Sequence, residues 1–291
     1  MLVVSPAHAV THIAQVSLRS HSQAGGLLKS AFLLVDWVCD AEVCQFGRTL
    51  PPFLVMENPK HVGIVAVSAE GAALCYRTIC GEAAAVMGPY MHPEITMHTV
   101  ALGEYIRTAN GRWNAVGELL LASAQKLRVA GADLLICPDN TAHESIDLVV
   151  ERSPLPWIHI ADEVARAAAT RGFERVGLLG TRYLMEGPVY PPKFASHGVG
   201  HLIPEASDRE RINQIIFDEL VYARFEAHSR EYFSGVIEKL RTRGCDAVAL
   251  SCTEIPLLVG DRDSSLPILD STRILARAAL REALGAAVVA S

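Results

Sequence analysis

The architecture of the chain is predicted from two stretches, Ile136-Cys137-Pro138-Asp139-Asn140-Thr141-Ala142-His143 and Leu250-Ser251-Cys252-Thr253-Glu254-Ile255-Pro256. Each follows a Gly-x-Asp step, at Gly131 and at Gly244, and a short apolar run. An apolar run that breaks into small polar residues is typical of a buried strand whose C-terminal end opens into a loop. Ligands bind at that end of the strands in open α/β sheets. We therefore expect two ligand-facing loops, one with the carboxyl of Asp139 and the other with the thiol of Cys252.

The composition narrows the class of protein. The chain has 291 residues, of which half are hydrophobic, and a formal net charge of −6, so it is long enough for one large domain or two smaller ones. Its mild acidity, without a basic stripe, argues against nucleic acid as a partner, and no apolar run is long enough to span a membrane. Seven irregularly spaced cysteines favour a reducing, cytoplasmic location and, without a Cys-x-x-Cys pair, predict no metal site.

Residues 1–57 form an N-terminal extension that differs from the rest of the chain. They lack sustained periodicity and end near Pro51-Pro52. A targeting segment is one interpretation. A poorly ordered appendage, or a stretch upstream of a start at Met56, is the interpretation we favour.

From Lys60 onward the pattern becomes regular. His61 to Val67 predicts a strand, and Ser68 begins a turn into a helix that runs through Ile79. Ile95 to Val100 predicts a second strand. Trp113 to Ala130 predicts a helix, because its apolar residues recur at helical spacing, and Gly131 ends it.

The same order of features then returns. Gly177 lies 114 residues after Gly63, Gly244 lies 113 after Gly131, and Pro267 lies 111 after Pro156, each in a similar context. We predict an α/β fold of two pseudosymmetric, Rossmann-like halves with parallel-rich sheets and the active site in the cleft between them. The approximate boundaries are 58–153 plus 266–291 for the first half and 154–265 for the second. Asp139 and Cys252, 113 residues apart, then occupy equivalent positions.

Asn140-Thr141-Ala142-His143 and Cys252-Thr253-Glu254-Ile255-Pro256 resemble the paired signatures of the aspartate/glutamate racemase superfamily. The resemblance covers nearly everything from Lys60 onward and is closest to a bacterial subgroup of broad-specificity amino-acid racemases. It implies an isomerase that works without pyridoxal phosphate or another cofactor. It further implies an amino acid or related carboxylic acid as substrate, and a homodimer.

The chemistry that this resemblance implies needs an acid and a base on opposite faces of the substrate's Cα, a task that two cysteines perform in the family. This sequence has Asp139 where the first cysteine is expected, and Cys137 is predicted to lie one step too deep to replace it. The similar subgroup tolerates a threonine at this position, so the loss of one thiol does not by itself predict inactivity. It does make a symmetric two-thiol mechanism doubtful.

Asp139 and the thiol that it replaces differ in acidity, since a free carboxyl titrates near 3.9 and a free thiol near 8.5. Asp139 serves as a base when ionised and as an acid only if burial raises its pKa. Its negative charge would repel a second carboxylate, which favours either a substrate other than the simple diacids or a protonated Asp139. The alternative is that Asp139 only caps its loop. For Cys252 we expect activation by a following helix N-terminus, and the alternative is an inert buried cysteine.

The predicted substrate-binding residues come from several loops. Asn140, Thr141 and Thr253 are expected to hold the substrate carboxylate together with Ser68, and Glu254 belongs to the same motif. Thr181 and Lys193 fall where relatives have a mobile flap, and Glu94 falls where relatives recognise substrate. Ordinary turn and capping chemistry is the alternative for the hydroxyl residues, and solvent exposure explains Lys193 and Glu94 equally well.

Three hypotheses about function remain. The first is a cofactor-independent amino-acid racemase or epimerase that uses Cys252 with Asp139. The second is a single-cysteine decarboxylase or cis–trans isomerase of the same superfamily. The third is a catalytically silent ligand-binding homologue.

Overall fold

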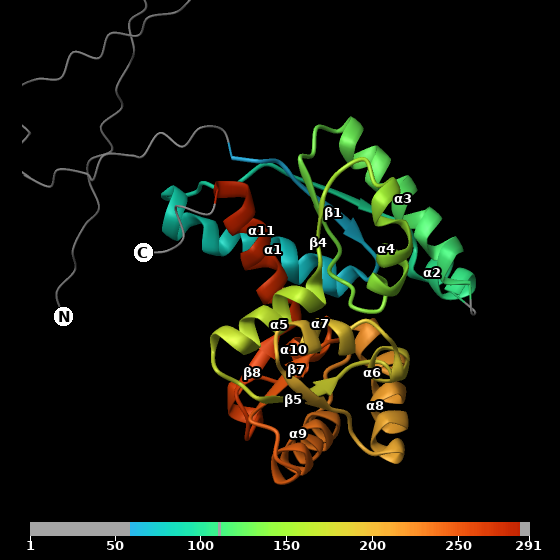
Figure 1. The fold of residues 1–291 in the computed structure, drawn as a ribbon, viewed down its shortest axis with the longest axis vertical. Coiled ribbons are helices and arrows are strands. Elements are labelled where there is room, and N and C mark those ends of the chain that lie inside the picture. Colours follow the sequence, from blue (N-terminus) through green and yellow to red (C-terminus); the bar gives the residue numbers. More distant parts are fainter. Residues whose placement is uncertain (1–58, 110–111, 286–291) are drawn as a thin grey trace, which may run out of the picture. The chain divides into compact units, whose positions relative to one another are not determined.

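The computed structural model describes residues 59–109 and 112–285, so the predicted extension at 1–57 lies outside the described residues (Figure 1). The first half contains a parallel sheet of order β2-β1-β3-β4. Its strands are β1 (Val62–Ala66), β2 (Ile95–Thr99), β3 (Leu134–Ile136) and β4 (Trp157–Ile158).

The second half contains a parallel sheet with the same order, β6-β5-β7-β8. Its strands are β5 (Arg175–Leu179), β6 (Gly200–Leu202), β7 (Ala247–Leu250) and β8 (Ile268–Asp270). Because each strand of the first sheet has a counterpart in the second, the predicted α/β class with two halves of one topology is confirmed.

Helices cover both sheets (Figure 1). Those that begin before β5 are α1 (Ala69–Met87), α2 (Leu102–Ala109), α3 (Trp113–Val129), α4 (His143–Val149), η1 (Val150–Arg152) and α5 (Ile160–Thr170). Those that follow are α6 (Arg182–Glu186), α7 (Pro191–Ser196), α8 (Ala206–Asp218), η2 (Leu220–Tyr222), α9 (Ala227–Thr242), α10 (Ile255–Leu258), η3 (Asp261–Asp263) and α11 (Ser271–Leu284). None of the helices in the described part of the chain has the length and hydropathy that a membrane span requires.

The repeated Gly-x-Asp step has a structural role in both halves. Gly131 follows α3 with φ 94°, and Gly244 follows α9 with φ 90°, a left-handed conformation that favours glycine. The carboxylate of Asp133 then accepts a hydrogen bond of 2.7 Å from the backbone N–H of His61, at the start of β1. Asp246 accepts one of 2.7 Å from Glu174, just before β5. The step therefore ties the end of a helix to the start of the central strand.

Two helices are exchanged between the halves. After β4, α5 packs with Val164 and Ala168 into the core of the second sheet. After β8, α11 packs with Leu275 and Ala279 into the core of the first sheet, and Figure 1 shows red α11 beside teal α1. By sheet membership, the chain therefore changes halves after β4 and β8, one short strand later than the boundaries expected at 153 and 265.

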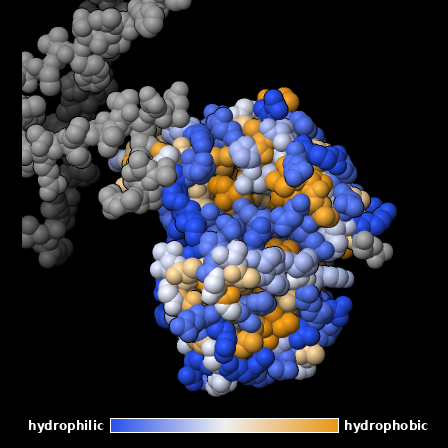
Figure 2. Space-filling model, in the orientation of Figure 1, coloured by the Kyte–Doolittle hydropathy of each residue, from blue (hydrophilic) through white to orange (hydrophobic). Residues whose placement is uncertain are grey.

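Hydrophilic residues cover most of the face drawn in Figure 2, where apolar residues form separate patches. The large apolar side chains instead fill cores on the faces of the two sheets. Ile64 and Leu135 are fully buried in the first half, and Leu178 and Leu250 in the second. The sheets are therefore rigid supports for the loops at their ends.

Candidate active site

One pocket of about 770 Å³ lies at the C-terminal ends of strands from both halves, and both Asp139 and Cys252 line it. Asp139 is the third residue after β3, and Cys252 is the second residue after β7. β3 and β7 occupy the same place in the two sheets, each between the first strand and the last. The duplicated scaffold thus brings a carboxyl and a thiol to one cavity.

Asp139 both caps its loop and faces the pocket. Its Oδ1 accepts a hydrogen bond of 2.8 Å from the backbone N–H of Ala142, so the capping role considered from the sequence is real. The residue is partly buried, and burial raises the pKa of its carboxyl to about 6; the Ala142 N–H opposes this rise and the nearby Glu254 adds to it. At neutral pH Asp139 is therefore mostly ionised, but its pKa lies much closer to neutral pH than that of an ordinary aspartate.

His143 holds the Asp139 loop against the second half. Its Nδ1–H donates to the carbonyl oxygen of Asp139 at 2.8 Å, which leaves Nε2 to accept from the backbone N–H of Ile160 at 3.2 Å. Burial lowers the pKa of His143 to about 3, so the ring is neutral. It is fully buried and absent from the pocket lining, so it has a packing role rather than contact with a ligand.

Cys252 is held in the protonated state. Its Sγ–H donates to Oε2 of Glu254 at 3.0 Å. Burial raises the pKa of Cys252 well above the ordinary thiol value, and the negative charge of Glu254 raises it further. The structure does not favour the expected activation of this thiol by a helix N-terminus, because α10 has only four residues and both burial and the Glu254 carboxylate favour the protonated form.

Glu254 is itself buried at 3% exposure, and its Oε1 has no hydrogen-bond partner among the described residues. It lines the pocket. A buried carboxylate oxygen without a partner is costly. The pocket therefore presents an unmet acceptor beside the thiol.

Four hydroxyl side chains lie near the two reactive groups. They form two pairs, and each pair joins a residue of the first half to a residue of the second. Ser68 and Thr253 lie 3.4 Å apart, and Thr141 and Thr181 share a hydrogen bond of 3.2 Å. Ser68 caps α1 by accepting from the backbone N–H of Gly71, and Thr181 caps α6 in the same way. Ser68, Thr141 and Thr181 line the pocket, whereas Thr253 lies behind the lining at 2% exposure.

Asn140 joins the two halves behind the pocket. Its Nδ2 donates to Ser271 Oγ at 3.0 Å, and its Oδ1 accepts from the Tyr190 hydroxyl at 2.6 Å. The side chain is 3% exposed and is not part of the lining. Its position favours a structural tie between the loops over the substrate contact expected from the sequence.

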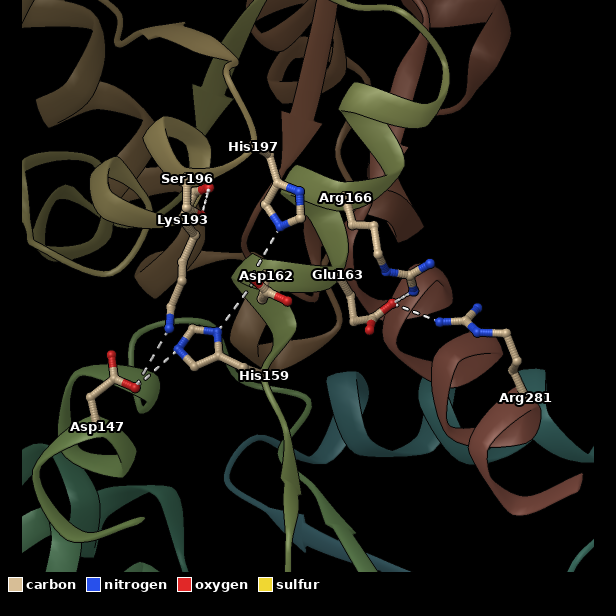
Figure 3. Close-up of polar contacts among 9 residues, drawn as sticks. All are labelled: Asp147, His159, Asp162, Glu163, Arg166, Lys193, Ser196, His197 and Arg281. Atoms are coloured by element: carbon tan, nitrogen blue, oxygen red, sulfur yellow. Dashed lines mark hydrogen bonds and ion pairs between the residues drawn. The ribbon is translucent and has the colours of Figure 1, made fainter. Parts of the chain in front are cut away.

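Glu94 and Lys193 lie away from the pocket lining. Glu94 directly precedes β2, so it lies at the N-terminal edge of the sheet, opposite the site, and its side chain is 76% exposed. Lys193 on α7 points toward Asp147 on α4, at 4.0 Å, in the seam of polar contacts drawn in Figure 3. His159 meets the same carboxylate at 3.4 Å. Glu94 and Lys193 are therefore not brought to Asp139 and Cys252.

The apolar wall of the pocket was not predicted from the sequence. Its main side chains come from α2, α3, α8 and η2: Leu102, Tyr105, Trp113, Val116, Phe217 and Val221. The helical spacing of the apolar residues in 113–130, Val116 among them, was the available signal. It does not distinguish a side chain that faces another helix from one that faces a cavity.

Cys137 is fully buried in the first-half core and does not line the pocket, as expected for a residue one step too deep. Within residues 59–109 and 112–285, no three His, Cys, Asp or Glu side chains are grouped so that they would hold a metal ion.

Comparison with known proteins agrees with this geometry. The profile of the Asp/Glu/hydantoin racemase family matches residues 64–279. RacX of Bacillus subtilis strain 168, a broad-specificity amino-acid racemase, is 23% identical over 158 residues, which are 54% of this chain and 68% of RacX.

Two solved structures are similar in fold. A protein assigned as an Asp/Glu racemase from Yersinia pestis is 35% identical with a TM-score of 0.71, and the match covers 78% of this chain and 100% of that one. An aspartate racemase homologue from Pyrococcus horikoshii OT3 is 27% identical with a TM-score of 0.68, with 77% and 99% covered.

Proposed function

Because the chain belongs to the Asp/Glu/hydantoin racemase family, which supports a racemase-type isomerase function, we propose that it is a cofactor-independent amino-acid racemase or epimerase. Cys252 and Asp139 are the proposed acid and base at the substrate's Cα. The observation that carries this proposal is that both groups, from equivalent loops of two halves, line one pocket.

The protonation states suit opposite roles. Above pH of about 6 Asp139 is a carboxylate, and Cys252 remains a thiol because burial and Glu254 raise its pKa. Asp139 then removes the α-proton from one face, and the Cys252 S–H delivers a proton to the other. The reverse reaction starts from the enzyme form in which Asp139 is protonated and Cys252 is a thiolate.

Glu254 and the hydroxyls have supporting roles in this proposal. Glu254 accepts the S–H of Cys252 and so favours return of a proton to the sulfur after each turnover. The substrate carboxylate is placed at the N-terminus of α1, which Ser68 caps, in the pocket that Thr141 and Thr181 also line. Hydrogen-bond donors there stabilise the negative charge that develops on the carboxylate when the α-proton leaves.

The decisive experiment is exchange of the α-hydrogen in deuterium oxide, followed by NMR and chiral chromatography over a panel of L- and D-amino acids. Wild-type protein is expected to incorporate deuterium and to form the opposite enantiomer. Cys252→Ala should reduce the rate by about 10²–10⁴-fold, the usual contribution of general acid–base catalysis. Cys80→Ser, a partly buried cysteine on α1 outside the pocket, is the matched control and should keep the wild-type rate.

Other outcomes favour the other hypotheses. Carbon dioxide release or alkene isomerisation that depends on Cys252 but not on Asp139 would indicate a single-cysteine reaction. Binding without exchange would indicate a silent homologue. Independence of exchange from Cys252 would refute the assigned roles.

We further propose that the protein is a homodimer in the cytoplasm. Support comes from the family resemblance and from the irregular use of seven cysteines. Sedimentation velocity at micromolar concentration tests the first statement, since a single monomer peak would exclude a stable dimer.

A further inference from the structure

The pocket has a marked division between its two ends. The reactive end holds two carboxyl groups, Asp139 and Glu254, beside the Cys252 thiol. The remaining wall is apolar and is built by side chains from both halves, among them Trp113 and Val116 from α3 and Phe217 from α8. A ligand that fills the cavity must therefore be polar at one end and apolar at the other.

No cation in the described lining is available for a second carboxylate. Arg107 is the one basic residue there; its side chain is 71% exposed and is paired with Glu104 one helical turn away. A substrate with an acidic side chain would place its second charge against apolar walls, or near Asp139 and Glu254. Both placements cost free energy, because a buried charge needs a partner.

The size of the pocket points in the same direction. A volume of about 770 Å³ lies in the upper part of the range of about 300–1,000 Å³ that is usual for pockets that enclose large organic ligands. A substrate with a small side chain would leave the walls formed by Trp113 and Phe217 in contact with water. An aromatic or branched aliphatic side chain would cover them and gain the hydrophobic free energy of that burial.

We propose that the substrate is an amino acid with a bulky, uncharged, apolar side chain, phenylalanine or leucine in chemical character. This inference rests on the proposed function for the position of Cα and the carboxylate. Phe217 is a specificity-determining residue in this arrangement, because it brings an aromatic ring from α8 to a pocket whose other aromatic residues, Tyr105, Trp113 and Tyr183, come from α2, α3 and α6.

Isothermal titration of wild-type protein with L-phenylalanine, L-leucine, L-alanine and L-aspartate tests the proposal. Because one methylene in an apolar pocket is worth about 10–200-fold, phenylalanine and leucine should each bind at least about tenfold more tightly than alanine, and aspartate should be the weakest. Aspartate binding as tightly as phenylalanine, or phenylalanine binding no tighter than alanine, would overturn the proposal.

A pair of variants locates the effect. Phe217→Ala should weaken phenylalanine binding at least about tenfold and leave alanine binding nearly unchanged. Phe225→Ala is the matched control, because Phe225 packs partly buried against the same core cluster but does not line the pocket. If Phe217→Ala does not fold, judged by its thermal unfolding, Phe217→Leu serves in its place. Equal effects of the two positions would contradict the assignment.

Deuterium exchange in the same samples separates this inference from the proposed function. Tight phenylalanine binding without exchange would support the substrate class and refute the racemase. Exchange that is fastest with aspartate would support the racemase and refute the substrate class.

Discussion

The loops after β3 and β7 occupy equivalent places in the two halves and yet carry opposite chemistry. In the first, Asp139 has its pKa raised to about 6 and is mostly ionised at neutral pH. In the second, Cys252 keeps its proton because burial and Glu254 raise its pKa. In the first loop, the position equivalent to Glu254 is held by Thr141, which hydrogen-bonds to the hydroxyl of Thr181 rather than to the reactive group. A duplicated backbone therefore sets position alone, and the immediate neighbours set which group is acid and which is base.

Removing the ionisable group of the first loop should have the largest effect. Asp139→Asn keeps an oxygen to accept the Ala142 N–H but cannot take a proton, so α-deuterium exchange should fall about 10²–10⁴-fold. Asp147→Asn on α4, an acid-to-amide change outside the pocket lining, is the control and should remain within about threefold of wild type. If Asp139→Asn kept its activity, Asp139 would not be the base, and the proposed difference in role between the two loops would be wrong.

Close contact between the second loop and the first half is tested by glycine substitutions in α1. A Cβ on Gly71 would lie 2.1 Å from Thr253 Oγ1, so Gly71→Ala should destabilise the fold by about 1–3 kcal/mol. Gly81 in the same helix has open space around it, so Gly81→Ala should stabilise by up to about 1 kcal/mol. Urea unfolding of both variants measures the difference in their free energies of unfolding. Equal values would show that Thr253 moves away from the added methyl group at no cost.

The same Asp139→Asn variant should be more stable than wild type above pH 6. The pKa of Asp139 is raised from 3.8 to about 6, so the folded state holds its proton more tightly than the unfolded state, and the ionised form costs stability. This cost is present in full above pH 6 and disappears as pH falls through 3.8. We expect a gain of about 1–3 kcal/mol at pH 7.5 that vanishes near pH 4, measured by thermal unfolding. A gain that does not change with pH would assign the cost to packing rather than to charge.

The smallest expected effect is the pH dependence of turnover. For the direction in which Asp139 is the base, kcat/KM should rise about tenfold per pH unit below about 6 and then remain level. It should not fall until pH exceeds the ordinary thiol range, since the pKa of Cys252 is raised. Asp139→Cys would remove the limb near pH 6. A midpoint near 4 in the wild type would mean that Asp139 is not the base.

The backbone of this protein was easier to predict than its pocket. Each Gly-x-Asp step ends a helix and ties it to the next strand through contacts that are close in space. The step therefore recurs as a short sequence motif, at Gly131 and Gly244, and this motif predicted both sheets. Asp139 and Cys252 followed, because a side chain just after a parallel strand lies at its C-terminal edge. Glu94 was misplaced because it precedes its strand and so lies at the opposite edge.

The remaining features depend on contacts between distant segments. Lys193 lies beside Asp147, and the side chain of Asn140 is hydrogen-bonded to Ser271 at the start of α11 and to Tyr190 from the second half. No local pattern encodes such partners. The apolar wall could not be predicted for the same reason, because its residues, such as Trp113 on α3 and Phe217 on α8, come from distant parts of the sequence.

The exchange of α5 and α11 means that neither half is complete without the other. A single copy of the repeat would end in a helix that has no place on its own sheet, since α5 fills the core of the second sheet and α11 that of the first. Such a copy would bury its apolar surface only by trading its last helix with an identical copy. A single half expressed alone is therefore expected to form an arm-swapped dimer, whereas the duplicated chain satisfies both exchanges within itself.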